Sequence, residues 1–282
     1  MHDYILTLSC PDRTGIVHAV TGWLLKHDGN ILEAQQYGDP ETKHFFLRIH
    51  FSLPEATTTS HLQEKFDIVA RAFNMDAHIY DAQKPARLLL LASKQGHCLN
   101  DLLFRWRSKQ LTVDIAAVVS NHNVHADMVD SYGLPYYHFP VSPETKLKQE
   151  QKILDLVDKL QIDLVVLARY MQVLSPRACD ALSGKAINIH HSFLPSFKGA
   201  RPYHQAHARG VKVIGATAHY VTKDLDEGPI IEQDVAHVSH TMDINDLTRV
   251  GSDIESLVLA RAVAAHVEHR ILLNGQRTIV FR

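Results

Sequence analysis

The sequence predicts an α/β protein with two domains, a small βαββαβ unit of ferredoxin-like order followed by a doubly wound, mostly parallel sheet. Up to residue 80, strand-like alternation and helical periodicity follow one another in the order βαββαβ. From residue 86 onward, apolar strand-like runs alternate with helical patterns, which is typical of a parallel sheet covered on both faces. A chain of 282 residues with 45% hydrophobic side chains can bury a core in each domain.

The first unit opens with residues 3–10, which alternate like a half-buried strand. A helical pattern over 16–25 follows. The other elements of this unit are expected as strands at 31–38 and 44–53, a helix at 60–73 and a strand at 75–80. A short linker closed by the helix-breaking Pro85 then predicts one domain over 1–84 and a second over 85–282.

The second unit starts with a near-continuous apolar run at 86–93, the pattern of a strand covered on both faces. Its further elements are expected as helices at 97–108, 124–131, 144–160 and 243–273, and as strands at 113–119, 136–139, 163–168, 186–190, 212–222, 229–236 and 277–281. Ligands of such sheets bind at the carboxyl ends of the strands. The polar residues expected to gather there are Ser93, Asn121, Arg169 and His190.

Composition excludes several classes of protein. The formal net charge is -2, and the Lys and Arg residues are scattered, so no basic surface for nucleic acid is expected. The N-terminus has no basic segment followed by an apolar core, and the aliphatic run 88–92 is too short to span a bilayer. Cys10, Cys98 and Cys179 lack the spacing of a metal site, as expected of reduced thiols. We therefore expect a cytoplasmic protein without a nucleic-acid or membrane partner.

Twenty histidines make a metal site worth considering. His190 and His191 are adjacent and are expected to point to opposite faces of a strand. His204 and His207 share a helix face, but no acidic ligand stands near them in the sequence. Because the sequence contains no clear ligand set, we expect no metal.

The residues with the clearest chemistry stand at the end of the strand at 186–190. Asn188 and His190 are two residues apart and so project from one face. An amide and an imidazole placed together can polarise a carbonyl, since both can donate hydrogen bonds to a developing oxyanion. The loop that follows the strand at 212–222 supplies carboxylates, Asp224, Asp226 and Glu227. Each of these residues also has a plain structural explanation. Asn188 could cap a turn, His190 could be an ordinary core histidine, and the carboxylates could form a solvated acidic loop.

The two stretches together resemble the catalytic core of the folate-dependent formyltransferase superfamily, whose motif is Asn-x-His, then a Pro and Gly segment, then His-x-Val-x-x-x-x-Asp-x-Gly. The resemblance implies a catalytic triad of Asn188, His190 and Asp226, with Asp224 as the neighbour most easily mistaken for Asp226. The segment 166–176 resembles the one that lines the folate pocket in that superfamily. The folate-binding residues implied are Leu167, Arg169, Tyr170, Met171, Val173, Leu174, Gly199, Thr222 and Asp224. Lys198, Arg201 and Arg169 either hold the glutamate tail of the folate or are ordinary surface charges.

The turn at 93–99 separates two kinds of reaction. Superfamily members that act on a phosphorylated amine have a Gly-rich turn there, whose backbone N–H groups cradle the phosphate. This chain has Gly96 alone, with His97 where the helix begins. It therefore resembles the members that hydrolyse 10-formyltetrahydrofolate to formate and tetrahydrofolate, with water as the second reactant and no metal or cofactor. That role supplies formate for purine synthesis. The alternatives are formyl transfer to a small amine and a catalytically silent folate sensor.

The N-terminal unit carries a second resemblance. Residues 10–17 resemble the Asp-Arg-x-Gly-Ile signature of ACT domains, which sense amino acids or mediate oligomerisation in metabolic enzymes. A plain strand-to-helix turn that needs Gly15 gives the same pattern. The resemblance implies a homo-oligomer and an amino-acid effector bound near Asp12, Gly15 and Asn30.

Overall fold

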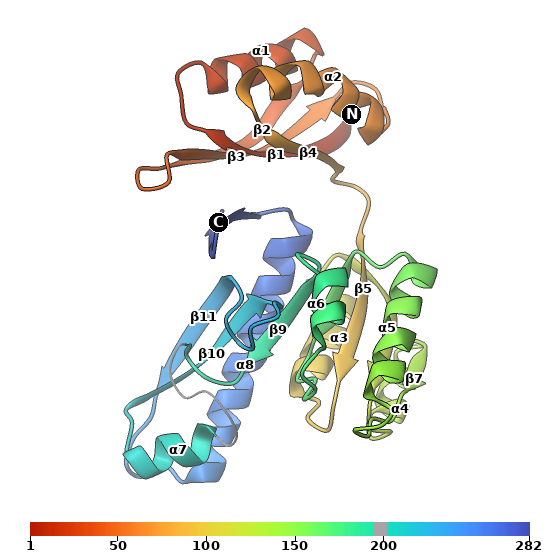
Figure 1. Cartoon of the computed structure of the whole chain (residues 1–282), viewed down its shortest axis with the longest axis vertical. Coiled ribbons are helices and arrows are strands. Elements are labelled where there is room, and N and C mark those ends of the chain that lie inside the picture. Colours follow the sequence, from red (N-terminus) through yellow and green to blue (C-terminus); the bar gives the residue numbers. More distant parts are fainter. Residues whose placement is uncertain (195–201) are drawn as a thin grey trace. The chain divides into compact units, whose positions relative to one another are not determined.

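A computed structural model describes residues 1–194 and 202–282 and divides the chain into two compact units (Figure 1). The first unit comprises residues 1–85 together with 265–282, and the second comprises 86–264. The sequence division instead assigned everything after residue 84 to the second domain. The last eighteen residues, 265–282, thus pack with the N-terminal unit rather than with the sheet that precedes them.

The first unit contains a four-stranded antiparallel sheet in the order β2-β3-β1-β4, with α1 and α2 on one face (Figure 1). Its elements are β1 (His2–Pro11), α1 (Ile16–Lys26), β2 (Asn30–Asp39), β3 (His44–Leu53), α2 (Thr59–Phe73) and β4 (Asp76–Asp81). The predicted βαββαβ order is confirmed. Alternate residues of β3, among them Leu47, Ile49 and Phe51, form the core with the apolar sides of the helices.

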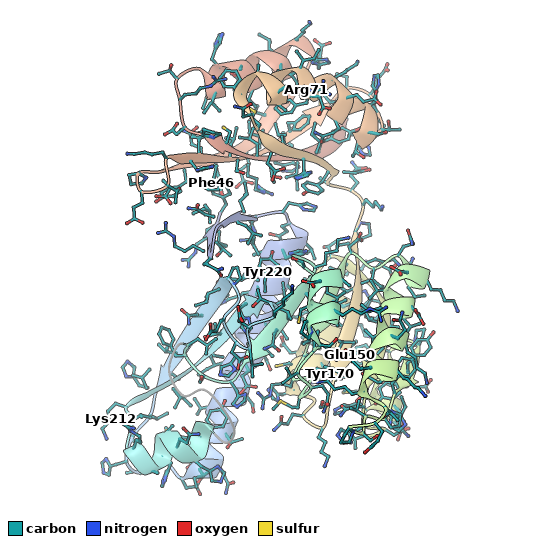
Figure 2. The ribbon with its side chains drawn as sticks, viewed as in Figure 1. Phe46, Arg71, Glu150, Tyr170, Lys212 and Tyr220 are labelled. Carbon is teal, nitrogen blue, oxygen red and sulfur yellow. The ribbon has the colours of Figure 1, made fainter. Side chains whose placement is uncertain are left out.

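The opposite face of this sheet is covered by the C-terminal segment, a hairpin of β12 (Ile271–Asn274) and β13 (Arg277–Val280). Phe46, which lies on the face away from the helices, packs against Leu272 and Phe281 (Figure 2). The guanidinium of Arg48 donates hydrogen bonds to the carbonyl of Glu268 at 3.1 and 3.2 Å. These contacts explain why residues 265–282 belong to the first unit.

The predicted helix over 243–273 is wrong at its C-terminal end. The helix α8 (Ile244–Val267) stops two residues before His269, whose φ of 52° is left-handed and cannot continue a helix. Taken alone, the apolar run that begins at Ile271 fits both the helical and the strand spacing of apolar residues. Gly275, with φ of 62°, makes the turn that sends the chain back as β13.

The second unit contains a seven-stranded sheet in the order β11-β10-β9-β8-β5-β6-β7. Its elements are β5 (Ala86–Ala92), α3 (His97–Arg107), β6 (Val113–Ser120), α4 (Ala126–Ser131), β7 (Tyr136–His138), α5 (Lys146–Leu160), β8 (Leu164–Leu167), α6 (Pro176–Ala181), β9 (Ala186–His190), α7 (Pro202–Arg209), β10 (Val213–Tyr220), β11 (Ile230–His237) and α8. Strands β5 to β9 are parallel, and β10 and β11 are antiparallel to their neighbours. The predicted mostly parallel sheet is confirmed.

Helices cover both faces of this sheet (Figure 1). Helices α5 and α6 pack over Leu89 and Leu91 of β5, while α3 and α8 lie on the other face. This burial on both faces explains why β5 reads as a continuous apolar run. Within residues 1–194 and 202–282, we find no helix that is both long and apolar enough to cross a bilayer.

The chain order reverses across the sheet beside β5, which lies between β6 and β8. The carboxyl ends of β5 and β8 therefore border a crevice, as in other open α/β sheets. Strand β9 runs parallel to β8 and antiparallel to β10, so that Asn188 pairs with His219. This pairing brings the two sequence motifs together.

Candidate active site

A cavity of about 780 Å³ opens at the carboxyl ends of β5, β8 and β9. As expected from the strand pattern, Ser93, Asn121, Arg169 and His190 all line it. Ser93 connects three of the segments, because its hydroxyl donates to Asn121 Oδ1 at 2.8 Å and accepts from the backbone N–H of Met171 at 2.9 Å. The loop after β8 is thereby fixed to the end of β5.

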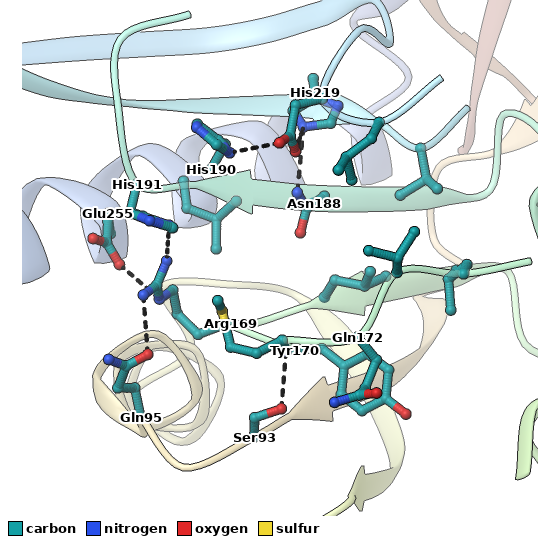
Figure 3. Close-up of a pocket in the computed structure, with 18 of the residues that line it drawn as sticks. Ser93, Gln95, Arg169, Tyr170, Gln172, Asn188, His190, His191, His219 and Glu255 are labelled. Atoms are coloured by element: carbon teal, nitrogen blue, oxygen red, sulfur yellow. Dashed lines mark hydrogen bonds and ion pairs between the residues drawn. The ribbon is translucent and has the colours of Figure 1, made fainter. Parts of the chain in front are cut away.

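Asn188 and His190 lie on one side of this cavity, next to His219 (Figure 3), and Asp226 also lines it. The Nδ1 atom of His190 lies 3.2 Å from Oδ2 of Asp226. His190 is 5% exposed, and its other ring nitrogen, Nε2, is buried without a hydrogen-bond partner among the residues described. With Nδ1–H donated to the carboxylate, Nε2 is free for a ligand. Asp224, by contrast, is exposed and its backbone carbonyl accepts from Thr222.

His219, in β10, completes the group and was assigned no role by sequence reasoning. Its Nδ1 donates to the backbone carbonyl of Tyr220 at 2.9 Å. Its Nε2 lies 3.3 Å from Asn188 Nδ2 and 3.7 Å from Asp226 Oδ1. The contact with His219 fixes the side chain of Asn188 at the edge of the cavity. This role follows from the pairing of His219 with Asn188 between β10 and β9.

The Asp226 carboxyl is ionised at neutral pH. Burial alone would raise its pKa, but the hydrogen bonds and charges of His190 and His219 outweigh burial and hold this pKa well below its usual range. The ionised carboxylate accepts the Nδ1–H of His190 and so fixes the orientation of that ring.

Backbone geometry places Asp226 over β9. Tyr220 N–H donates to the carbonyl of Pro229 at 3.0 Å, which closes the loop between β10 and β11. At Gly228 the loop passes so close to the strand that an added Cβ would lie 1.8 Å from the Tyr220 carbonyl oxygen. Asp226 itself adopts a left-handed φ of 57°. The glycine two residues after Asp226 is thus a steric requirement of the loop.

All but one of the expected folate-binding residues line the same cavity. Those that line it are Leu167, Arg169, Tyr170, Met171, Val173, Leu174, Thr222 and Asp224. Gly199, together with Lys198 and Arg201, lies outside the described residues. Tyr170 is 4% exposed and its hydroxyl accepts from Gln149 at 2.6 Å. Burial raises the pKa of Tyr170 to about 12, so this phenol stays neutral.

A second polar group lies on the α3 and α8 side of the cavity, centred on Glu255 of α8 (Figure 3). Glu255 is 1% exposed and its carboxylate lies 2.7 Å from His97 Nε2 and 3.2 Å from Arg169 Nε. Tyr203 donates its hydroxyl to the other carboxylate oxygen. Burial would raise the pKa of Glu255, but His97 and Arg169 lower it, so it is a carboxylate. Sequence reasoning missed Glu255 and Tyr203.

The remaining guanidinium nitrogens of Arg169 are also engaged. Nη2 donates to Gln95 Oε1 at 2.9 Å, and Nη1 donates to His191 Nδ1. Burial, then the charges of Arg169 and His190, lower the pKa of His191 to about 4, so its ring is neutral and accepts. The rings of His190 and His191 are stacked with centroids 5.1 Å apart. The expectation that they point to opposite faces is wrong, because β9 ends at His190 and the chain bends there.

Ligand atoms that could converge on a metal, within the described part of the chain, belong to His97, Cys98 and Glu255. Burial raises the pKa of the Cys98 thiol, and Glu255 is already neutralised by Arg169. A neutral thiol is a poor metal ligand. This chemistry does not favour a metal at that place.

The residues expected to bind an effector are far apart in the first unit. Asp12 lies beside Gly38, near the end of β2, because a Cβ on Gly38 would lie 3.2 Å from its carboxylate. Gly15 follows shortly after Asp12 with a left-handed φ of 92°. Asn30 begins β2 at its opposite end, roughly 25 Å away at about 3.3 Å per residue. One chain does not bring all of them together.

Comparison with known proteins agrees with this geometry. Residues 86–263 match the family described as Formyl transferase. A formyltetrahydrofolate deformylase of Corynebacterium sp. (strain P-1) is 49% identical over 99% of this chain and 98% of its own length. The crystal structure of formyltetrahydrofolate deformylase from Burkholderia mallei is 49% identical, covers 100% of both chains and superposes with a TM-score of 0.95.

A more distant likeness covers part of the chain. The crystal structure of glycinamide ribonucleotide transformylase 1 from Symbiobacterium toebii is 28% identical, covers 72% of this chain and 97% of its own, and has a TM-score of 0.67. The two deformylases thus match over the whole chain, and this transformylase matches over part of it. This chain belongs to the formyltetrahydrofolate deformylase family.

Proposed function

We propose that this chain hydrolyses 10-formyltetrahydrofolate to formate and tetrahydrofolate. The observation that carries the proposal is the buried pair of His190 and Asp226, in a cavity that Asn188 also lines, with His190 Nε2 buried and unpartnered among the described residues. A buried polar atom without a partner is costly unless a ligand uses it. Membership of the deformylase family agrees with this use.

In the proposed reaction, water adds to the formyl carbon and one of its protons passes to the Asp226 carboxylate. The carbonyl oxygen becomes an oxyanion, which receives hydrogen bonds from the Asn188 amide and from His190 Nε2–H. The intermediate then collapses, the bond between the formyl carbon and N10 breaks, and N10 takes up the proton that Asp226 accepted. Formic acid loses its remaining proton to solvent. The products are formate and tetrahydrofolate. Because the formyl group leaves from an aryl amine, the residues named need no metal for this reaction.

The apolar side of the cavity supports the choice of folate. Met171 and Val173 are each 53% exposed and Leu225 is 60% exposed, although all line the cavity. Exposed apolar side chains gathered at a cavity are typical of a site for a flat, largely apolar ligand. The backbone of this loop is held by Ser93, so the surface is formed before the ligand binds.

In the cell, we place this reaction in the cytoplasm, where it would release formate for purine synthesis and regenerate free tetrahydrofolate. The purified protein incubated with 10-formyltetrahydrofolate should release formate and tetrahydrofolate in equal amounts. Binding of folate without turnover would instead identify a silent sensor. Turnover that requires an added amine would identify a transferase.

We also propose that the first unit is an ACT domain that joins subunits and binds an amino acid. The βαββαβ order supports this, as does β2, an edge strand whose side chains are mostly exposed, with Leu32 at 50% and Tyr37 at 43%. Since Asp12 and Asn30 lie at opposite ends of β2, an effector touching both would have to sit between two copies.

The test of this proposal is light scattering together with activity in the presence of glycine or methionine, two amino acids tied to one-carbon supply. We expect an oligomer whose activity changes by about 5- to 150-fold on effector binding. A monomer whose activity is indifferent to both amino acids would contradict it.

A further inference from the structure

Arg169 has a backbone conformation that its side chain disfavours. Its φ of 63° is left-handed, a region that glycine adopts freely and residues with a Cβ avoid. It follows β8 directly, at the edge of the cavity. Such a conformation persists where surrounding contacts determine it, and it concentrates at functional sites. The contacts of the Arg169 side chain are therefore informative.

Those contacts form a built network. The guanidinium is 6% exposed and contacts Glu255, Gln95 and His191. Glu255 is held in turn by His97 and Tyr203. A Cβ on Gly251 of α8 would lie 2.0 Å from the Tyr203 hydroxyl oxygen, so the absence of a side chain there lets Tyr203 reach Glu255. The guanidinium is therefore fixed rather than free to hold the glutamate tail of a folate.

The position of the guanidinium matters for the reaction. His191, which Arg169 contacts, stacks on His190, so a single imidazole ring separates the guanidinium from the ring that is proposed to bind the oxyanion. It points to the α3 and α8 side of the cavity, away from Tyr170 and Gln172 in the folate segment (Figure 3). An acceptor that reaches the formyl carbon without displacing the folate would have to enter from this side.

We propose that the ion pair of Arg169 and Glu255 fills the acceptor position of the cavity and thereby restricts the nucleophile to water. The inference rests on the proposed function and names the residues that set its specificity. Because Glu255 is paired with Arg169 and His191 is neutral, this position offers no unpaired negative charge that would attract a protonated amine. Water is small enough to pass and needs no ionic partner.

The competing reactions differ in one atom. In hydrolysis the water oxygen bonds to the formyl carbon, the bond to N10 breaks, and formate leaves while N10 gains a proton. In transfer an uncharged primary amine forms the new bond through its nitrogen, loses one proton to the base, and leaves as a formamide while N10 gains a proton. Both routes yield tetrahydrofolate, so formate and formamide report separately on the two nucleophiles.

The experiment uses glycinamide as the probe, because it is a small primary amine without a phosphate. Formate and formylglycinamide are measured by mass spectrometry for the full-length protein and for Arg169→Gly. Glycine suits the left-handed backbone, and the substitution empties the space of the guanidinium. We expect the ratio of formylglycinamide to formate to rise at least about tenfold, which corresponds to about 1.4 kcal/mol.

Two further variants guard the interpretation. Arg169→Gly with Glu255→Gln removes both charges, so that no buried carboxylate is left unpaired, and it should give the same rise in the ratio. Arg105→Ala removes an arginine that pairs with Asp101 on α3 and does not line the cavity. This control variant should give the same ratio of formylglycinamide to formate as the unmodified protein.

The unmodified protein provides a readout that does not depend on folding of any variant. Glycinamide should neither yield formylglycinamide nor slow formate release from it. Formylglycinamide made by the unmodified protein would overturn the inference, because the acceptor position would then be open. Variants that release formate but never formylate glycinamide would also overturn the inference. Absence of formate from the unmodified protein would instead contradict the proposed function.

Discussion

The Nδ1 atom of His190 lies 3.2 Å from Oδ2 of Asp226, although His190 ends one strand of the sheet and Asp226 belongs to the loop after another. This contact assigns each ring nitrogen a task. Nδ1 faces the carboxylate, and Nε2 is buried and without a partner among the residues described, in a side chain that lines the cavity. The proposed proton transfers depend on this orientation.

Asp226→Asn should leave folate binding nearly normal and lower kcat by about 10²- to 10⁴-fold, because the amide keeps the shape but cannot accept the proton. Formate release gives kcat, and a fluorescence titration with a folate gives Kd. Asp224→Asn is the matched control, since Asp224 is exposed in the same loop. A larger loss of kcat in the control would show that the register of the motif is displaced by two residues.

Asn188→Ala should fold normally and lower kcat by about 10²- to 10³-fold, since one oxyanion donor is worth about 2.7–4 kcal/mol in the transition state. The Asn188 amide contacts His219 on its far side, so the remaining group stays in place. Steady-state kinetics separate kcat from KM. An unchanged kcat would remove Asn188 from the proposed mechanism.

Gly228→Ala should damage both folding and activity. The added methyl would lie 1.8 Å from the Tyr220 carbonyl oxygen, so the loop must move and carry Asp226 away from His190. We expect the free energy of unfolding to fall by about 1–3 kcal/mol, measured in urea, and kcat to fall with it. Gly22→Ala is the control, because nothing lies within 4 Å of its Cβ position. Full activity of Gly228→Ala would show that the loop does not position Asp226.

Local patterns were sufficient to predict the order of the elements and the buried strand that carries Asn188 and His190. Asp226 was singled out only by the resemblance to the superfamily motif, because Asp224 and Glu227 stand beside it in the same polar loop. Glu255 could not be recognised in this way. It is one of several polar residues in α8, and only the packing of α3, α7 and the loop after β8 around it makes it a buried centre.

The C-terminal hairpin was mispredicted for a related reason. Ile271, Leu272 and Leu273 form an apolar run too short to distinguish helix from strand. The strand is selected by contacts distant in sequence, the packing of Leu272 on Phe46 and the hydrogen bond from Asn274 to Asp39 at 2.6 Å. Patterns within the segment contain no information about those partners.

The segment between α8 and this hairpin contains a partly buried titratable group, His269. Its ring stacks on Tyr80 with centroids 3.6 Å apart. Burial, then the charges of His266 and Arg48, lower its pKa from 6.5 to about 4. Above pH 6.5 the ring is neutral in both the folded and the unfolded chain. As the pH falls from 6.5 towards about 4, the unfolded chain takes up a proton that the folded chain does not, so stability is lost on acidification.

His269→Asn should therefore reduce the loss of stability between pH 7 and pH 5 by up to about 2 kcal/mol, since each unit of pKa difference is worth about 1.4 kcal/mol. Asparagine tolerates the left-handed backbone of this position, so the variant should fold. The measurement is urea unfolding of both proteins at the two pH values. His61→Asn, on the exposed side of α2, is the matched control and should keep the full loss. An equal loss in His269→Asn and in the unmodified protein would show that other groups, such as His191 and the buried carboxylates, account for the acid sensitivity.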